Sequence, residues 1–213
     1  MEPHGSQPLM HAGAPLGTAP VLIMVHGRGA GPKNILDLVP RLECSRFTCL
    51  APAAAGHAWY PYSFLEDTAK NEPGLSSALE TLRQLVDDTL ARGIPAEQIV
   101  LLGFSQGACL TAEFAARHTR RYGGVIIFSG GLIGPPDTPR TYPGAFDGTP
   151  IFLGCSDVDH HVPQTRVDET AGVFTRMGAR VDERLYPGMA HIVNDDEIVA
   201  ARAILDAVTT TNT

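Results

Sequence analysis

The chain has 213 residues, of which 44% are hydrophobic and 18% are charged, and its formal net charge is −7. This length suits one domain with a sizeable core, and the ordinary composition predicts a soluble globular protein. An acidic balance gives no electrostatic reason to expect nucleic acid or an anionic membrane as a partner.

Neither membrane insertion nor secretion is indicated by the sequence. No apolar run approaches the roughly 20 residues that span a bilayer, and residues 1–20 contain no Lys or Arg with which to begin a secretory signal. The four cysteines match no zinc motif and are too sparse for a disulfide scaffold. We therefore expect a cytoplasmic protein with reduced thiols.

Short apolar runs alternate with longer segments of helical periodicity. The apolar runs predict strands at 21–25, 47–50, 99–104, 125–128 and 151–154, and the alternating residues 179–186 predict a sixth strand. Helices are predicted at 33–42, 75–91, 106–118, 164–177 and 195–208, the last with Asn194 as its N-cap. Such alternation predicts an α/β fold with a mostly parallel central sheet flanked by helices. We expect one domain over residues 1–213, in which 1–20 are irregular or form an edge strand, and 51–73 and 130–149 are loops.

The motif Gly-x-Ser-x-Gly stands where a predicted strand meets a predicted helix. It reads Gly103-Phe104-Ser105-Gln106-Gly107. In a nucleophile elbow the serine occupies a sharp, strained turn, and glycines are needed because side chains there would collide with the neighbouring strand or helix. The helix N-terminus also favours developing negative charge. Ser105 is therefore the predicted nucleophile, in preference to a serine of an ordinary Gly-containing loop.

A serine nucleophile needs a base and an orienting carboxylate, which in this arrangement follow in the order Asp or Glu, then His. His191 follows the sixth predicted strand and is the only histidine after His161, so it is the predicted base. Asp157 and Asp159 both follow the fifth strand, and their spacing leaves both open as the acid.

An oxyanion hole needs backbone N–H groups directed at the tetrahedral oxygen. The residue after the nucleophile, Gln106, is predicted to supply one of them. The loop 26–30 after the first predicted strand, His-Gly-Arg-Gly-Ala, is predicted to supply the other through Arg28.

Taken together, these motifs resemble the phospholipase/carboxylesterase family, which includes carboxylesterases, acyl-protein thioesterases and lysophospholipases. The matching segments are 26–29, 59–61, 103–107, 159–163 and 188–191. The resemblance implies an α/β-hydrolase fold, a three-layer sandwich, with Asp159 as the acid, Arg28 and Gln106 as oxyanion donors, and no metal or organic cofactor. Homodimers, common in the family, are a further option. Arg28 departs from the family, which often has an apolar residue at this position. Its guanidinium could favour acidic substrates or point to solvent, and we expect the latter.

Candidate pocket residues lie on the loops above Ser105: Trp59, Tyr60, Leu132, Ile133 and Met189. The absence of a long apolar lid favours a serine carboxylesterase acting on small-molecule esters of short to medium chain length. An acyl-thioesterase or a lysophospholipase would use the same triad. Two less favoured alternatives are a metal-dependent phosphoesterase built on the cluster 157–161 and a non-catalytic binding module.

Overall fold

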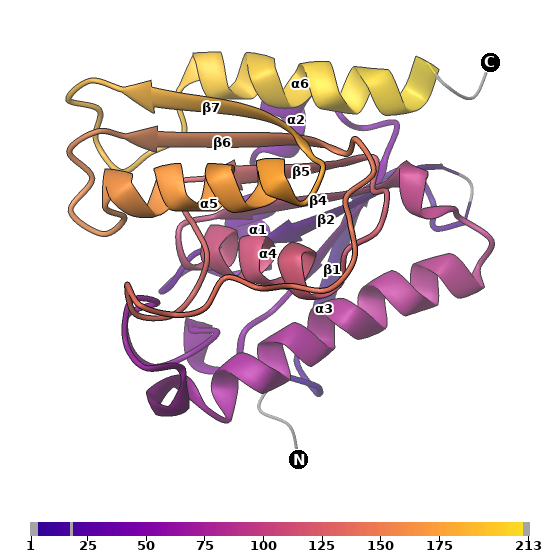
Figure 1. The fold of residues 1–213 in the computed structure, drawn as a ribbon. Coiled ribbons are helices and arrows are strands. Elements are labelled where there is room, and N and C mark those ends of the chain that lie inside the picture. The colour runs from indigo at the N-terminus through magenta and orange to yellow at the C-terminus, as the bar shows by residue number, and fades with distance from the viewer. Residues whose placement is uncertain (1–3, 18, 211–213) are drawn as a thin grey trace.

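A single seven-stranded sheet organises the chain in the computed structural model, which describes residues 4–17 and 19–210 (Figure 1). The strands, in spatial order, are β1 (Leu9–Gly13), β3 (Thr48–Pro52), β2 (Val21–Val25), β4 (Ile99–Phe104), β5 (Gly124–Phe128), β6 (Pro150–Ser156) and β7 (Arg180–Tyr186). β1 pairs antiparallel with β3, and every other pairing is parallel. Residues 9–13 therefore form the edge strand that the sequence left as one of two options.

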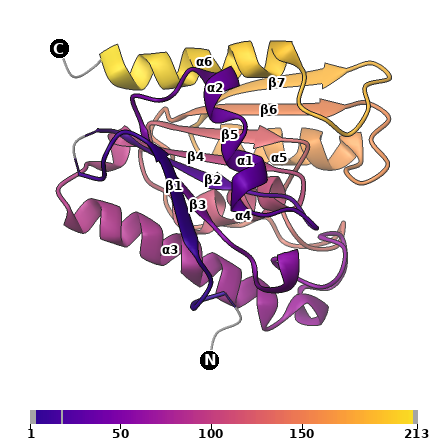
Figure 2. The ribbon, with the colours of Figure 1, turned by 180° about the vertical axis from the view of Figure 1, so that it is seen from behind.

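Helices cover both faces of the sheet. One face carries α3 (Gly74–Ala91), α4 (Gln106–Arg117) and α5 (Gln164–Arg176), and the other carries α1 (Pro32–Leu36), α2 (Val39–Leu42) and α6 (Asp195–Thr210) (Figures 1 and 2). Three short 3-10 helices, Ala55–His57, Thr68–Asn71 and Ala96–Gln98, lie in the connections. The predicted three-layer α/β sandwich is confirmed.

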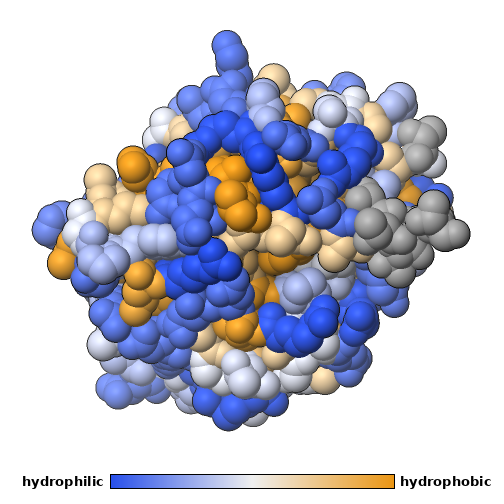
Figure 3. All heavy atoms as spheres, turned by 90° about the horizontal axis from the view of Figure 1, so that it is seen from above, coloured by the Kyte–Doolittle hydropathy of each residue, from blue (hydrophilic) through white to orange (hydrophobic). Residues whose placement is uncertain are grey.

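The two cores meet through strands that are buried on both sides. In β2, Val21, Ile23 and Val25 pack into one core, whereas Leu22 and Met24 pack into the other. A parallel strand covered on both faces is expected to be a continuous apolar run of this kind. On the face that carries α6, apolar side chains gather through the middle and hydrophilic ones surround them (Figure 3).

One predicted helix is wrong, because residues 33–42 form two short helices rather than one. The second helix has Pro40 in its first turn. Proline has no N–H to donate to the preceding turn and clashes with it, so the first helix ends before this point. At the other end of the chain the predicted cap is confirmed: Asn194 Oδ1 accepts from the N–H of Glu197 at 2.8 Å, and Glu197 Oε2 accepts from the N–H of Asn194 at 2.9 Å.

Parallel strands bring the loops that follow them to one edge of the sheet. The loops after β2, β4, β6 and β7, which hold the predicted site residues, therefore lie together at the carboxyl ends of the strands. Among the residues that the structure describes, no helix is both long and apolar enough to cross a membrane.

Candidate active site

Ser105 lies at the sharp turn between β4 and α4, with φ 56° and ψ −122°. A positive φ is strained for a residue with a side chain, and such strain is typical of functional turns. The flanking glycines are sterically required: a Cβ on Gly107 would lie 2.2 Å from the carbonyl oxygen of Val25, and one on Gly103 would lie 2.3 Å from that of Gly107. The collisions predicted from the sequence are therefore present in the structure.

A continuous hydrogen-bonded chain joins Ser105, His191 and Asp159. His191 Nε2 lies 2.8 Å from Ser105 Oγ, and His191 Nδ1 lies 2.6 Å from Asp159 Oδ2. The three side chains come from the ends of β4, β6 and β7, up to 86 residues apart in the sequence. In this arrangement the imidazole can accept the serine proton while the carboxylate holds the ring.

Asp159 is held as a carboxylate at the end of this chain. Its side chain is buried, which by itself would raise its pKa, but hydrogen bonds from His191 and from the backbone N–H groups of His161 and Val162 bring the pKa below its usual value. Those N–H groups reach Asp159 Oδ1 at 2.8 and 3.1 Å. Asp159 therefore stays ionised at neutral pH, as an orienting group for the imidazole must.

Asp157, the alternative acid, occupies a different place. Its Oδ1 accepts from the backbone N–H of Gly188 at 2.8 Å, and its own N–H donates to the carbonyl of Tyr186 at 3.3 Å. Asp157 is exposed and holds the loop that carries His191, rather than the imidazole itself. The structure thus brings Asp159, and not Asp157, to the imidazole.

Two aromatic side chains to which the sequence gave no role beside the base pack against His191. The Phe104 ring is tilted against the imidazole with centroids 5.1 Å apart, and the His161 ring meets it edge-on at 4.9 Å. Both residues neighbour predicted site residues in the sequence, and this adjacency was the available signal. Together they restrict the directions in which the imidazole can turn.

The two predicted oxyanion donors lie beside Ser105. A Cβ on Gly27 would lie 3.3 Å from Ser105 Cβ, so the loop after β2 runs directly against the nucleophile. Among the described residues, neither the N–H of Arg28 nor that of Gln106 has a hydrogen-bond partner. Both residues line the cavity over Ser105. Their N–H groups are available for an oxyanion there.

The Arg28 side chain is exposed, as expected, but its guanidinium also contacts the protein. Its Nη1 donates to the carbonyl of Pro61 at 2.9 Å, and its Nη2 donates to the carbonyls of Tyr60 at 2.8 Å and Tyr62 at 2.7 Å. Although the side chain is exposed, the backbone of residues 60–62 turns three acceptors towards it. A guanidinium with several coplanar N–H groups suits such a set of carbonyls.

The cavity over Ser105 has a volume of about 600 Å³. The residues that line it include the aromatic Tyr60, Tyr62, Phe64 and Phe104, together with Arg28, His161 and His191. Of the predicted pocket residues only Tyr60 reaches it. Trp59 is fully buried, with its indole N–H bonded to the carbonyl of His26 at 2.8 Å, and Met189 Sδ instead accepts from Asn194 Nδ2 at 2.9 Å.

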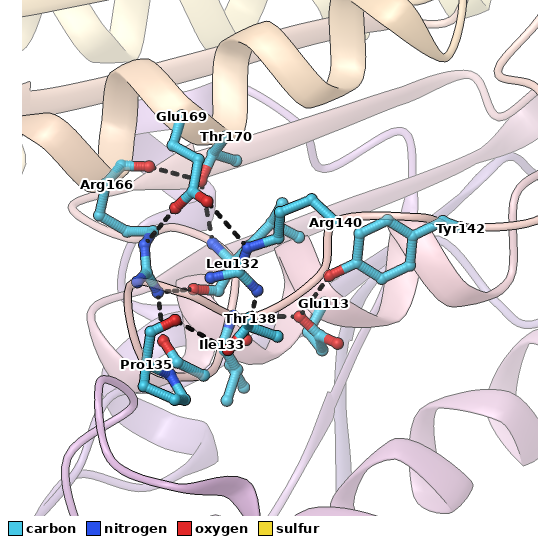
Figure 4. A network of polar contacts seen from close by, with 11 residues as sticks. Glu113, Leu132, Ile133, Pro135, Thr138, Arg140, Tyr142, Arg166, Glu169 and Thr170 are labelled. Atoms are coloured by element: carbon cyan, nitrogen blue, oxygen red, sulfur yellow. Dashed lines mark hydrogen bonds and ion pairs between the residues drawn. The ribbon is translucent and has the colours of Figure 1, made fainter.

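Leu132 and Ile133 do not line the cavity either, because the loop after β5 is fixed inside the protein (Figure 4). Thr170 Oγ1 accepts from the N–H of Leu132 at 3.0 Å, and a carboxylate oxygen of Glu113 accepts from that of Ile133 at 3.0 Å. The buried Arg166 donates to the carbonyl of Leu132. Both apolar side chains are therefore core residues, and their prediction as pocket residues is wrong.

The cluster 157–161 does not gather into a metal site. Among the described residues, no three His, Cys, Asp or Glu side chains converge closely enough to hold a metal ion. Asp157 and Asp159 instead hydrogen-bond to separate residues of the loop after β7, Gly188 and His191. The described residues of this cluster therefore provide no set of ligands for the metal-dependent alternative.

Comparisons with known proteins agree with this geometry. A family model described as phospholipase/carboxylesterase matches residues 16–209. Acyl-protein thioesterase 1 of Eremothecium gossypii is 31% identical over 74% of this chain and 68% of its own length, and a probable carboxylesterase of Oryza sativa subsp. japonica is 30% identical over 61% and 48%. A crystal structure of a phospholipase/carboxylesterase from Dyadobacter fermentans matches with a TM-score of 0.91 and 40% identity, covering 96% of this chain and 98% of that one. The predicted α/β-hydrolase fold is confirmed.

Proposed function

Given that this chain belongs to the phospholipase/carboxylesterase family, we propose that it is a serine carboxylesterase with Ser105 as nucleophile, His191 as base and Asp159 as orienting acid. Family membership makes it a hydrolase that acts on ester bonds. The observation that carries the finer assignment is the unbroken chain of hydrogen bonds from Ser105 Oγ through His191 to Asp159.

The proposed reaction proceeds in two halves. His191 removes the proton from Ser105 as its oxygen attacks the carbonyl carbon, while the N–H groups of Arg28 and Gln106 stabilise the oxyanion. The imidazolium, stabilised by Asp159, then protonates the leaving alkoxide. Water, activated by the same imidazole, hydrolyses the acyl-enzyme and frees Ser105. These steps use only side chains and backbone groups of this chain.

The shape of the cavity supports small-molecule esters with short to medium acyl chains. Its volume of about 600 Å³ lies in the range of small-ligand sites. The aromatic side chains of its lining and the polar groups near Ser105 suit an apolar acyl group held next to a reacting carbonyl.

A thioester substrate is the second candidate, since several relatives bear the name acyl-protein thioesterase 1. The same three residues would perform that reaction, with a thiolate as the leaving group. Comparing p-nitrophenyl esters of increasing chain length with acyl thioesters and a lysophospholipid would separate the candidates. A strong preference for thioester or lysophospholipid would overturn the carboxylesterase assignment.

A fluorophosphonate probe tests the nucleophile directly, because it modifies an activated serine. We expect the wild-type chain to be labelled and Ser105→Ala to remain unlabelled. Absence of labelling in the wild type, or equal labelling of Ser105→Ala, would overturn the proposed function.

A further inference from the structure

Both candidate oxyanion residues send their side chains to the same short segment, residues 60–62. Gln106 Nε2 donates to the Tyr60 carbonyl at 2.8 Å, and Arg28 Nη2 donates to the same oxygen at 2.8 Å. Arg28 also reaches the carbonyls of Pro61 and Tyr62. Since Tyr60 and Tyr62 line the cavity, these side chains link the oxyanion loop to the cavity wall.

We propose that the Arg28 guanidinium is a positioning residue that fixes the oxyanion N–H relative to the cavity wall. This inference rests on the proposed function, and it gives the side chain a role separate from that of the Arg28 backbone. The guanidinium acts through the carbonyls of residues 60–62 and does not itself touch the reacting atoms.

The loop after β2 depends on the Arg28 side chain for its position because glycines flank Arg28. Gly27 and Gly29 have no Cβ, and Gly29 adopts φ 76°, so the local backbone places few limits on where the Arg28 N–H points. A backbone hydrogen bond from Gly29 to His57 at 2.7 Å holds the loop after Arg28, and one from Ala30 back to Gly27 at 3.3 Å closes a turn around it. His26 Nδ1 also lies 2.8 Å from the carbonyl of Gly27. The contacts by which Arg28 itself joins this loop to residues 60–62 are those of its guanidinium.

The segment 60–62 in the cavity wall also depends on side-chain hydrogen bonds from other parts of the chain. Residues 60–62 lie outside every helix and strand, and their carbonyls have no ladder to pair with. Asn71 Oδ1 accepts from the N–H of Tyr62 at 2.8 Å. At the carbonyls of this segment Gln106 supplies one hydrogen bond, whereas Arg28 supplies three. A lysine ammonium is a single point of charge, so it does not reproduce the spread of N–H donors that meets three successive carbonyls.

Loss of the three Arg28 hydrogen bonds should weaken transition-state stabilisation more than substrate binding. Removing an oxyanion donor outright costs about 100- to 1,000-fold in kcat, and displacing one through its loop should cost part of this. For Arg28→Leu we expect kcat for p-nitrophenyl acetate to fall at least about tenfold, with KM changed less than about threefold. The acetyl group is too short to depend on the cavity wall, so KM should change little.

Arg180→Leu is the matched control. Arg180 is also exposed and donates to a loop carbonyl, that of Gly148 at 3.0 Å, but it begins β7 at the opposite end of the sheet from Ser105. Its kcat should stay at the wild-type value. Thermal melting of both variants compares their folded stability.

Two further arms separate positioning from general stabilisation. Arg28→Lys should remain as impaired as Arg28→Leu, because the charge alone is not sufficient. Arg28→Gly should regain activity with about 50 mM guanidinium, too little to unfold a domain, and should not respond to methylammonium. Recovery would show that the missing group is the planar set of donors.

The outcomes distinguish this inference from the proposed function. If the wild type is not labelled by a fluorophosphonate, the proposed function itself fails. If the wild type is labelled, wild-type kcat in Arg28→Leu, full activity in Arg28→Lys, or an equal loss in Arg180→Leu would each overturn the positioning role. A fall in melting temperature of Arg28→Leu with unchanged kcat would overturn it too, since the side chain would then only stabilise the fold.

Discussion

Replacing Asp159 with Asn should change which nitrogen of His191 carries the proton while preserving the shape of the site. Asp159 Oδ1 already accepts two backbone N–H groups, from His161 and Val162. The Asn carbonyl oxygen should keep that position, which turns the amide NH₂ towards His191 Nδ1, where Oδ2 now lies at 2.6 Å. Since an amide NH₂ only donates, Nδ1 must become the acceptor and Nε2 must carry the proton.

An imidazole protonated at Nε2 cannot accept the proton of Ser105, which lies 2.8 Å away. The comparable Asp-to-Asn change in a serine protease triad lowers kcat about 10,000-fold. We therefore expect Asp159→Asn to lower kcat/KM by about 1,000- to 10,000-fold, or about 4–5.5 kcal/mol of barrier. The measurement is p-nitrophenyl ester hydrolysis at neutral pH, with thermal melting to compare folding.

Asp157→Asn provides the matched control, since it makes the same chemical change two residues away. Its amide oxygen can still accept from the N–H of Gly188, so kcat/KM should stay within about threefold of the wild type. The reasoning would be refuted if Asp159→Asn kept more than about a tenth of the wild-type activity, or if Asp157→Asn lost as much.

Two predictions concern stability. Glu197 is fully buried, and burial raises its pKa to about 7, so ionising it lowers the free energy of unfolding of the wild type as pH rises from about 4.5 to about 7. In urea titrations Glu197→Gln should be more stable than the wild type by up to about 3 kcal/mol at about pH 8 and equal to it at about pH 4; equal stability of the two proteins at both pH values would contradict this. Gly107→Ala should lower the free energy of unfolding by several kcal/mol, because its Cβ would collide with the carbonyl of Val25, and a wild-type melting temperature would disprove the clash. The control is Gly172→Ala, inside α5 with only the flexible end of an arginine nearby, which should be neutral or stabilising.

Periodicity was sufficient to predict the sheet and the helices around it, because parallel strands buried on both faces are short apolar runs with little resemblance to the helices between them. It failed at residues 33–42, where the apolar spacing continues through Pro40 although the helical hydrogen bonds cannot. Apolar spacing records which side chains face inward. It does not record whether the backbone between them is continuous.

The catalytic candidates were predictable because they follow strands in a fixed order, and the topology then brings them to one edge. Pocket residues were not predictable in this way. Trp59 and Leu132 are apolar residues on loops, and apolar character does not separate a cavity wall from a core. Trp59 donates its indole N–H to the carbonyl of His26, and Leu132 donates its backbone N–H to Thr170 Oγ1, and both acceptors are distant in sequence. The contacts of the exposed Arg28 guanidinium were missed for the same reason, since its acceptors lie more than 30 residues away.

The shared acceptor at Tyr60 also bears on how acyl selectivity relates to rate in this chain. One carbonyl oxygen receives N–H groups from Arg28 and from Gln106, the two residues whose backbones are the proposed oxyanion donors. Tyr60 itself lines the cavity. A shift of the wall to admit a larger acyl group therefore pulls on both donors, because side chains in one hydrogen-bond network do not respond independently. Enlarging the cavity through residues 60–62 should thus lower kcat as well as change chain-length preference, whereas enlarging it at Phe64, outside this network, leaves the two donors in place.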